Sequence, residues 1–316
     1  MLPSLDEIRA ARGAIAGAAI RTPLVRLGLT DAPAEIHLKL ENLQPIGSFK
    51  IRGAMNALAH RERAELEQGV LTASAGNMAQ GVAWVARLWG LPCTVVAPDT
   101  VPEAKARAVE RLGARLLRVP FDDWWRAFET RSVPGVPGVF VHAFDDPLVM
   151  AGNGTIGLEI LEDLPDVEAI VVPWGGGGLA CGIAAAAKAL RPSVKVYAAE
   201  VDTAAPLSAS LLAGSPQRVP YQPSFVDGIG SKTVFASMFE RARGLVDGAI
   251  VSSLAEVGAA LKLIAERNHV IAEGAGGASV AAALSGRAGA GKIACIVSGG
   301  NIDLDRFGAV VAGKSG

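Results

Sequence analysis

Short apolar runs rich in β-branched residues alternate with longer Ala- and Leu-rich segments through much of the chain. The short runs predict strands at 35–41, 94–98, 115–119, 169–173, 195–200 and 294–298. The longer segments predict helices at 77–90, 102–113, 179–190 and 254–268. Strands and helices in alternation are typical of βαβ units, which build open, mostly parallel, twisted sheets with helices on both faces. The pattern therefore predicts an α/β fold.

The composition narrows the classes of protein to which the chain can belong. Its 316 residues are 50% hydrophobic and 19% charged, which is typical of a compact protein with a large core and is enough for two domains. The formal net charge of -1 provides no overall field that would attract nucleic acid or an anionic membrane surface. Cys93, Cys181 and Cys295 are widely spaced in apolar segments, which indicates buried thiols. The acidic N-terminal segment lacks the features of an export signal, so we expect a cytoplasmic protein.

The strongest local signal for chemistry is a run of four glycines between a predicted strand and a predicted helix. Gly175, Gly176, Gly177 and Gly178 follow the strand at 169–173. Glycine lets backbone N–H groups approach an anion closely at a helix N-terminus. A tight turn alone would need only one or two glycines, so we favour a phosphate site.

The same loop also satisfies a relaxed dinucleotide fingerprint. Gly175, Gly177 and Ala180 match G-x-G-x-x-A, and Glu200 ends the next predicted strand, where an acid could bind a ribose. A nicotinamide-dependent dehydrogenase is therefore an alternative, although no hydride-handling set is recognisable nearby.

Two further segments place polar residues where ligands often bind in α/β proteins. Residues 74–77, SAGN, form a turn that opens the predicted helix at 77–90, and Asn77 is either a plain N-cap or part of a carboxylate site. Ser298 ends the last predicted strand, at the sheet edge where ligands collect. By itself, Ser298 is more typical of a turn residue.

Lys50 lies between Phe49 and Ile51 in the segment GSFKIRGA. A lysine in this setting either extends its charge to water or takes part in chemistry, because desolvation lowers an amine's pKa and favours the neutral nucleophile. The sequence contains neither H-E-x-x-H nor G-x-S-x-G, and its four histidines share no motif spacing. It therefore gives no sign of metal-dependent hydrolysis or of triad catalysis.

Five blocks occur in a particular order: GSFKIRGA (47–54), SAGN (74–77), GNGTIGLEIL (152–161), GGGGL (175–179) and SGGNID (298–303). This ordered set resembles the fold type II pyridoxal-phosphate enzymes, in the branch of the serine/threonine dehydratases (ammonia-lyases) and serine racemases. The resemblance covers nearly the whole chain, from about Thr22 to Asp303. It implies a large domain made of residues 1–62 and 149–316, a small domain made of residues 63–148, and an active site between them.

The resemblance implies a role for each block. Lys50 would carry pyridoxal 5'-phosphate as a Schiff base and, once displaced by the substrate, would remove the Cα proton. Phe49 would lie against the cofactor ring, while Asn77 would bond the ring's 3'-oxygen and Ser298 its nitrogen. The phosphate would be held by Gly175, Gly176, Gly177, Gly178 and Leu179, and the substrate carboxylate by Ser74, Ala75, Gly76 and Met78.

The implied activity is dehydration and deamination of a β-hydroxy-α-amino acid of the threonine or serine type to a 2-oxo acid and ammonia. Ala75 stands where racemases of this branch carry a second serine, so racemisation is disfavoured. Met78 replaces the histidine that usually follows the asparagine. If Met78 faces the substrate it could accept a bulky β-substituent, so a dehydratase for phenylserine or for 3-hydroxyaspartate is an alternative. Met78 could equally point into the helix packing.

Two further expectations follow from the resemblance. Pro206 stands where some relatives carry an acid of a divalent-ion site, so we expect no metal there. Relatives are commonly homodimers, and we expect the same of this chain.

Overall fold

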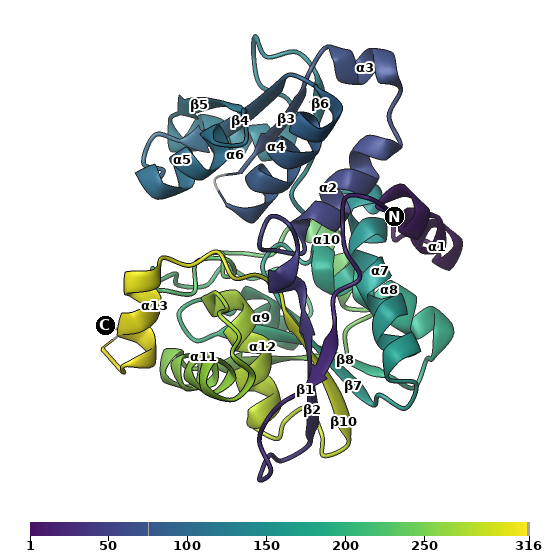
Figure 1. The fold of residues 1–316 in the computed structure, drawn as a ribbon, viewed down its shortest axis with the longest axis vertical. Coiled ribbons are helices and arrows are strands. Elements are labelled where there is room, and N and C mark those ends of the chain that lie inside the picture. Colours follow the sequence, from purple (N-terminus) through teal and green to yellow (C-terminus); the bar gives the residue numbers. More distant parts are fainter. Residues whose placement is uncertain (75, 315–316) are drawn as a thin grey trace.

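The computed structural model describes residues 1–74 and 76–314, which form two parallel-type sheets with helices around each (Figure 1). The larger sheet has the strand order β1-β2-β10-β7-β8-β9, and only the β1–β2 pair is antiparallel. The smaller sheet has the order β5-β4-β3-β6 and is parallel throughout. The strands are β1 (Leu24–Arg26), β2 (Glu35–Leu40), β3 (Val70–Ala73), β4 (Cys93–Pro98), β5 (Arg115–Val119), β6 (Val139–Phe140), β7 (Ala169–Pro173), β8 (Lys195–Val201), β9 (Gly248–Ser252) and β10 (Lys292–Val297).

Helices cover both faces of the larger sheet. Strand β7 shows why, because its alternate side chains enter two different cores: Val171 packs with α11 and α12, and Ile170 and Val172 pack with α7 and α8. A strand buried on both faces reads as a continuous apolar run. The helices are α1 (Leu5–Ala14), α2 (Lys50–Ala59), α3 (Arg63–Glu67), α4 (Asn77–Trp89), α5 (Glu103–Glu110), α6 (Phe121–Thr130), α7 (Pro147–Asp163), α8 (Gly178–Leu190), α9 (Pro206–Ala213), α10 (Ala236–Ala242), α11 (Leu254–Asn268), α12 (Gly274–Leu284) and α13 (Leu304–Val311), with a short 3-10 helix at Glu41–Leu43.

The predicted α/β class is confirmed, and the six predicted strands and four predicted helices all occur, with bounds within three residues of those expected. Among the described residues, four strands (β1, β3, β6 and β9) and nine helices (α1, α2, α3, α6, α7, α9, α10, α12 and α13) are additional to the prediction. Twelve consecutive residues of α7 are buried, so that helix has no polar stripe from which its period could be read.

The strands of the smaller sheet all lie between 70 and 140, and those of the larger sheet all lie outside that range. The exact division into domains at 62 and 149 stays a prediction. No helix within residues 1–74 and 76–314 is long and apolar enough to cross a bilayer.

Candidate active site

A cavity of about 310 Å³ lies between the two sheets, beyond the carboxyl ends of strands β3, β7 and β10. Ligands bind at such edges in open α/β sheets, because the loops after neighbouring parallel strands meet there. Among the described residues, the cavity brings together every site residue expected from the sequence; Ala75 lies outside the described residues. The wall includes Phe49, Lys50, Ser74, Gly76, Asn77, Met78, Gly175, Gly176, Gly177, Gly178, Leu179 and Ser298.

Lys50 is the first residue of α2, and its amine opens onto this cavity. Nζ donates a hydrogen bond to the carbonyl oxygen of Ala143 at 2.7 Å. Burial lowers the pKa of Lys50 to about 8, although the nearby Glu273 carboxyl opposes the shift. A lysine amine with a lowered pKa is neutral, and therefore nucleophilic, in a larger fraction of molecules near neutral pH.

A segment far away in the sequence, residues 298–299, holds the two residues directly before Lys50 in place. The N–H of Phe49 donates to the carbonyl oxygen of Ser298 at 3.0 Å, and Ser48 pairs with Gly299 as an isolated bridge. Ser298 is 2% exposed and directly follows β10. Ser298 and Lys50 therefore line the same cavity.

The four glycines form the turn between β7 and α8, and their backbone is packed from behind. Gly177 has a φ of 89°, and a Cβ atom there would clash with the ring of Trp174. At Gly178 a Cβ atom would lie 2.6 Å from the carbonyl oxygen of Phe144. A Cβ atom on Gly176 would also clash, with the ring of Phe144, so only glycine fits at positions 176 to 178; at Gly175 a Cβ atom would make ordinary contacts.

Helices α4 and α8 both begin at the cavity, and neither N-cap makes a side-chain hydrogen bond. The N-cap residues are Gly76 and Gly177, and each helix has 13 residues. The first N–H groups of a helix have no partner within it, and the helix dipole adds positive potential there. The cavity therefore offers two anion sites, which suits a ligand with a phosphate and a carboxylate.

We predict that Gly177→Ala weakens cofactor binding far more than Gly214→Ala, measured as the Kd of the purified apoprotein for pyridoxal phosphate. Both glycines have a positive φ, so both substitutions strain the backbone by a similar amount. A Cβ atom at Gly214 would meet no other atom within 4 Å, whereas one at Gly177 would meet Trp174. We expect at least about a tenfold rise in Kd for Gly177→Ala only. Equal rises in Kd for the two variants would contradict the assignment of the glycine turn as the site of the cofactor phosphate.

Asn77 does not cap α4 with its side chain, and the plain N-cap interpretation is wrong. It is the first residue of the helix, after Gly76. Its Nδ2 donates to Glu273 Oε1 at 2.8 Å, and its Oδ1 accepts from Asn301 Nδ2 at 2.8 Å. These two bonds fix the amide and leave one N–H of Nδ2 for a ligand.

Sequence reasoning missed Glu273 and Asn301. Glu273 is 6% exposed at the start of α12 and lines the cavity, and burial raises the pKa of its carboxyl to about 7. A Cβ atom on Gly299 would lie 2.6 Å from Glu273 Oε1, so the SGGN segment packs directly on this carboxyl. The only sequence signal for Glu273 is its place before the glycine-rich start of α12.

Met78 has a second environment besides the cavity. It is 1% exposed and belongs to the core that α4 forms with the smaller sheet. Most of its side chain is therefore used in helix packing, which was one of the two alternatives for this residue.

Glu200 is not positioned to bind a ribose. Its carboxylate accepts hydrogen bonds from the N–H groups of Leu207 and Ser208, at 2.8 Å and 2.7 Å, and it is 1% exposed. Burial raises its pKa to about 7. Glu200 therefore caps the start of α9. Without an acid free to bind a ribose, the glycine pattern no longer supports a dinucleotide site.

A nucleophilic lysine beside an uncapped, glycine-lined helix start defines an α/β enzyme that binds a phosphorylated carbonyl compound. The chain matches the model of the family described as "Pyridoxal-phosphate dependent enzyme" over residues 15–299, and it belongs to that family. The predicted resemblance is thereby confirmed.

Three relatives illustrate the likeness. The chain is 41% identical over 313 residues to an L-threonine ammonia-lyase of Thermotoga maritima, which covers 98% of this chain and 78% of the relative. It is 37% identical over 317 residues to the catabolic L-threonine dehydratase TdcB of Staphylococcus aureus, with 98% and 92% covered. The solved structure of maize serine racemase superimposes with a TM-score of 0.91 at 32% identity and covers 99% of this chain and 98% of its own.

The residues around the cavity fit pyridoxal 5'-phosphate. The glycine turn offers N–H groups to a phosphate, the Lys50 amine faces the same space, and the Ser298 hydroxyl is a neutral partner for a pyridine nitrogen. The cofactor predicted from the sequence is that of the family. The individual contacts remain predictions.

Proposed function

We propose that the chain dehydrates and deaminates a β-hydroxy-α-amino acid to a 2-oxo acid and ammonia. The observation that carries this proposal is the meeting of Lys50 with two uncapped helix starts in one cavity. The relatives named L-threonine ammonia-lyase and L-threonine dehydratase support this choice of reaction within the family.

The first task of the protein is to hold the substrate. The N–H groups at the start of α4 would bind its carboxylate, and residues 74–78 would surround it. When bound, the cofactor supplies a conjugated ring that accepts electrons from the substrate's Cα. The neutral hydroxyl of Ser298 would make that ring a weaker electron acceptor than an aspartate would, which favours elimination.

Lys50 performs the proton transfer in this proposal. Its amine, oriented by the Ala143 carbonyl, accepts the proton from Cα, and its lowered pKa suits a base that works near neutral pH. The Cβ–O bond then breaks, and the hydroxyl leaves as water after it gains a proton. The remaining enamine takes up water and releases ammonia, which gives the 2-oxo acid.

Release of ammonia and 2-oxo acid in equal amounts from at least one of serine, threonine, 3-hydroxyaspartate and phenylserine is the expected result with the purified holoenzyme. A coupled keto-acid assay and an ammonia assay measure the two products. Alanine, which lacks a β-hydroxyl, is the matched control and should give neither product. Racemisation of these substrates without ammonia release would contradict the proposal; the sequence disfavours it because Ala75 has no hydroxyl.

The oligomeric state and the cellular location of the protein are also proposals. We propose a homodimer in the cytoplasm, and size-exclusion chromatography with light scattering tests the first of these.

A further inference from the structure

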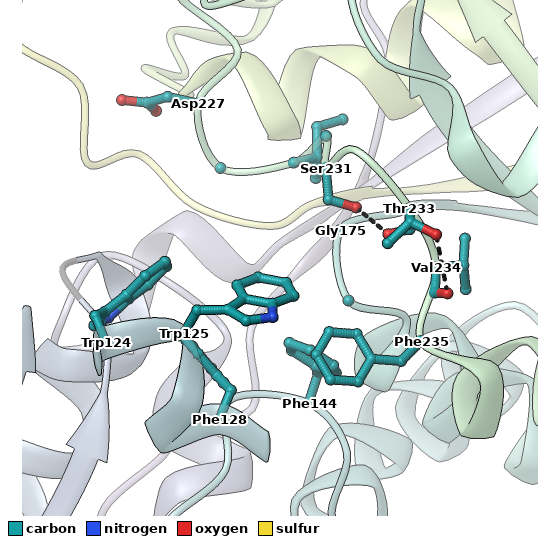
Figure 2. A pocket seen from close by; sticks show the side chains of 14 residues that line it. Trp124, Trp125, Phe128, Phe144, Gly175, Asp227, Ser231, Thr233, Val234 and Phe235 are labelled. Atoms are coloured by element: carbon teal, nitrogen blue, oxygen red, sulfur yellow. Dashed lines mark hydrogen bonds between the residues drawn. The ribbon is translucent and has the colours of Figure 1, made fainter. Parts of the chain in front are cut away.

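Aromatic side chains line one side of a second cavity, of about 180 Å³, beside the first (Figure 2). Trp124, Trp125 and Phe128 come from α6 of the smaller unit, whereas Phe144 follows β6 and Phe235 precedes α10. The ring of Trp125 lies 5.5 Å from that of Phe235, and Phe235 meets Phe144 edge-on at 5.2 Å. Rings from two separate parts of the fold thus form one wall.

This aromatic cavity is continuous with the cavity that holds Lys50. Phe144, Gly175, Gly176 and the segment 227–229 line both. Phe144 directly follows Ala143, whose carbonyl oxygen accepts the hydrogen bond from the Lys50 amine. Its ring is also packed against the glycine turn, because a Cβ atom on Gly176 would clash with it. The aromatic cavity therefore begins next to the reacting amine.

The lining of the aromatic cavity offers few available polar side-chain groups; among the described residues, the Nε1 N–H of Trp124 is the one buried side-chain polar atom of the lining without a hydrogen-bond partner. The hydroxyl of Ser231 donates to the carbonyl oxygen of Thr233 at 2.6 Å, and that of Thr233 turns to the backbone of Val234. The one charged residue at its edge, Asp227, is paired with Lys105 at 2.9 Å. Water binds weakly in such a cavity, because it finds few hydrogen-bond partners there.

The aromatic rings around this cavity are not packed as tightly as side chains in a hydrophobic core. Trp125, Phe144 and Phe235 are each only partly buried, although they are among the most apolar side chains of the region. An engineered apolar cavity of about 150 Å³ binds benzene, so 180 Å³ is enough for one phenyl ring. The methyl group of threonine would leave most of this volume unfilled.

We propose that the aromatic cavity is the subsite for the substrate's β-substituent, and that the preferred substrate is a β-hydroxy-α-amino acid with an aryl group on Cβ. The inference rests on the proposed function, because it assumes elimination at Lys50. Trp125 and Phe235 are specificity-determining residues: their rings contact the aryl group edge-on or stacked, and its burial provides binding that a methyl group cannot.

The test compares two pairs of compounds with the wild-type holoenzyme. Phenylserine should have a kcat/KM at least about tenfold that of threonine, from the rates of 2-oxo acid formation. L-phenylalanine and L-2-aminobutyrate are the same two molecules without the hydroxyl that must leave. Calorimetry should show that L-phenylalanine binds at least about tenfold more tightly, which measures the subsite without turnover.

Trp125→Ala should lower both preferences at least about tenfold, and Trp125→Phe, which keeps a ring, should retain most of them. Arg126→Ala is the matched control, because Arg126 directly follows Trp125 in α6, its side chain is 65% exposed, and it does not line the cavity. A loss with Arg126→Ala as large as with Trp125→Ala would mean that α6 was merely loosened, and it would overturn the assignment.

The outcomes separate this inference from the proposed function. Efficient ammonia release from threonine or serine, with phenylserine inactive and L-phenylalanine unbound, would overturn the aryl subsite and leave the lyase proposal intact. No ammonia from any β-hydroxy amino acid would overturn both.

Discussion

Replacing Lys50 with alanine is expected to lower kcat/KM for ammonia release by at least about 10³-fold, because the variant loses both the cofactor's covalent partner and the base at Cα. Mass spectrometry after borohydride reduction should find the cofactor on Lys50 of the wild type and on no residue of the variant. Lys262→Ala, at an exposed position of α11, is the matched control and should retain activity. A reduced adduct on a different lysine of the wild type would contradict the assignment of Lys50.

The same residue should give the uptake of the cofactor a recognisable pH dependence. Burial holds the Lys50 pKa at about 8, below the 10.5 of an ordinary lysine, and only the neutral amine attacks a carbonyl. The rate of covalent uptake by the wild-type apoprotein should therefore rise with pH up to about 8 and level off above it. A rate that still increases toward pH 10 would indicate an amine without this burial.

The parts of the site that could be predicted from the sequence are those encoded within one segment. The glycine turn is such a case: the strand before it, the four glycines and the helix after it are contiguous in the sequence, and the positive φ of Gly177 is a local backbone requirement. Lys50 was recognisable for the same reason, since its apolar neighbours are adjacent in the chain.

The parts that could not be predicted depend on contacts between distant segments. Asn77 and Glu273 are bonded across 196 positions of sequence, and Lys50 reaches Ala143 across 93. The glycines after Glu273 are the only local signal, and they do not indicate that its carboxyl faces a cavity. The proposed role of Trp125 could likewise not be predicted, because aromatic residues at helical spacing in α6 are equally consistent with ordinary core packing.

A buried cluster of charges next to Lys50 is another such long-range feature. Arg52 lies two residues after Lys50 in α2 and is fully buried. Its guanidinium forms paired hydrogen bonds of 2.7 to 2.9 Å with the carboxylates of Glu41 and Glu159. Lys39, also fully buried, lies 2.6 Å from Glu159. Two positive and two negative charges therefore compensate one another in the protein interior.

Arg52→Met is expected to lower the free energy of unfolding by about 3–5 kcal/mol, because it leaves a carboxylate buried without its partner. Denaturant titration at neutral pH measures the change. Arg52→Lys keeps the charge but cannot bind two carboxylates in the paired geometry, so an intermediate loss is expected. Arg9→Ala removes an exposed ion pair with Asp6 from α1 and should change stability by less than about 1 kcal/mol.

The position of Arg52 links this loss of stability to catalysis. Because Arg52 and Lys50 belong to the same first turn of α2, a displaced guanidinium would also shift this turn. The shift would weaken the bond from the Phe49 N–H to the Ser298 carbonyl and the bond from Lys50 Nζ to the Ala143 carbonyl. Arg52→Met should accordingly lower cofactor affinity under conditions in which the protein is still folded, whereas Arg9→Ala should not. Wild-type affinity and stability in Arg52→Met would mean that the buried charges neither support the fold nor position the lysine.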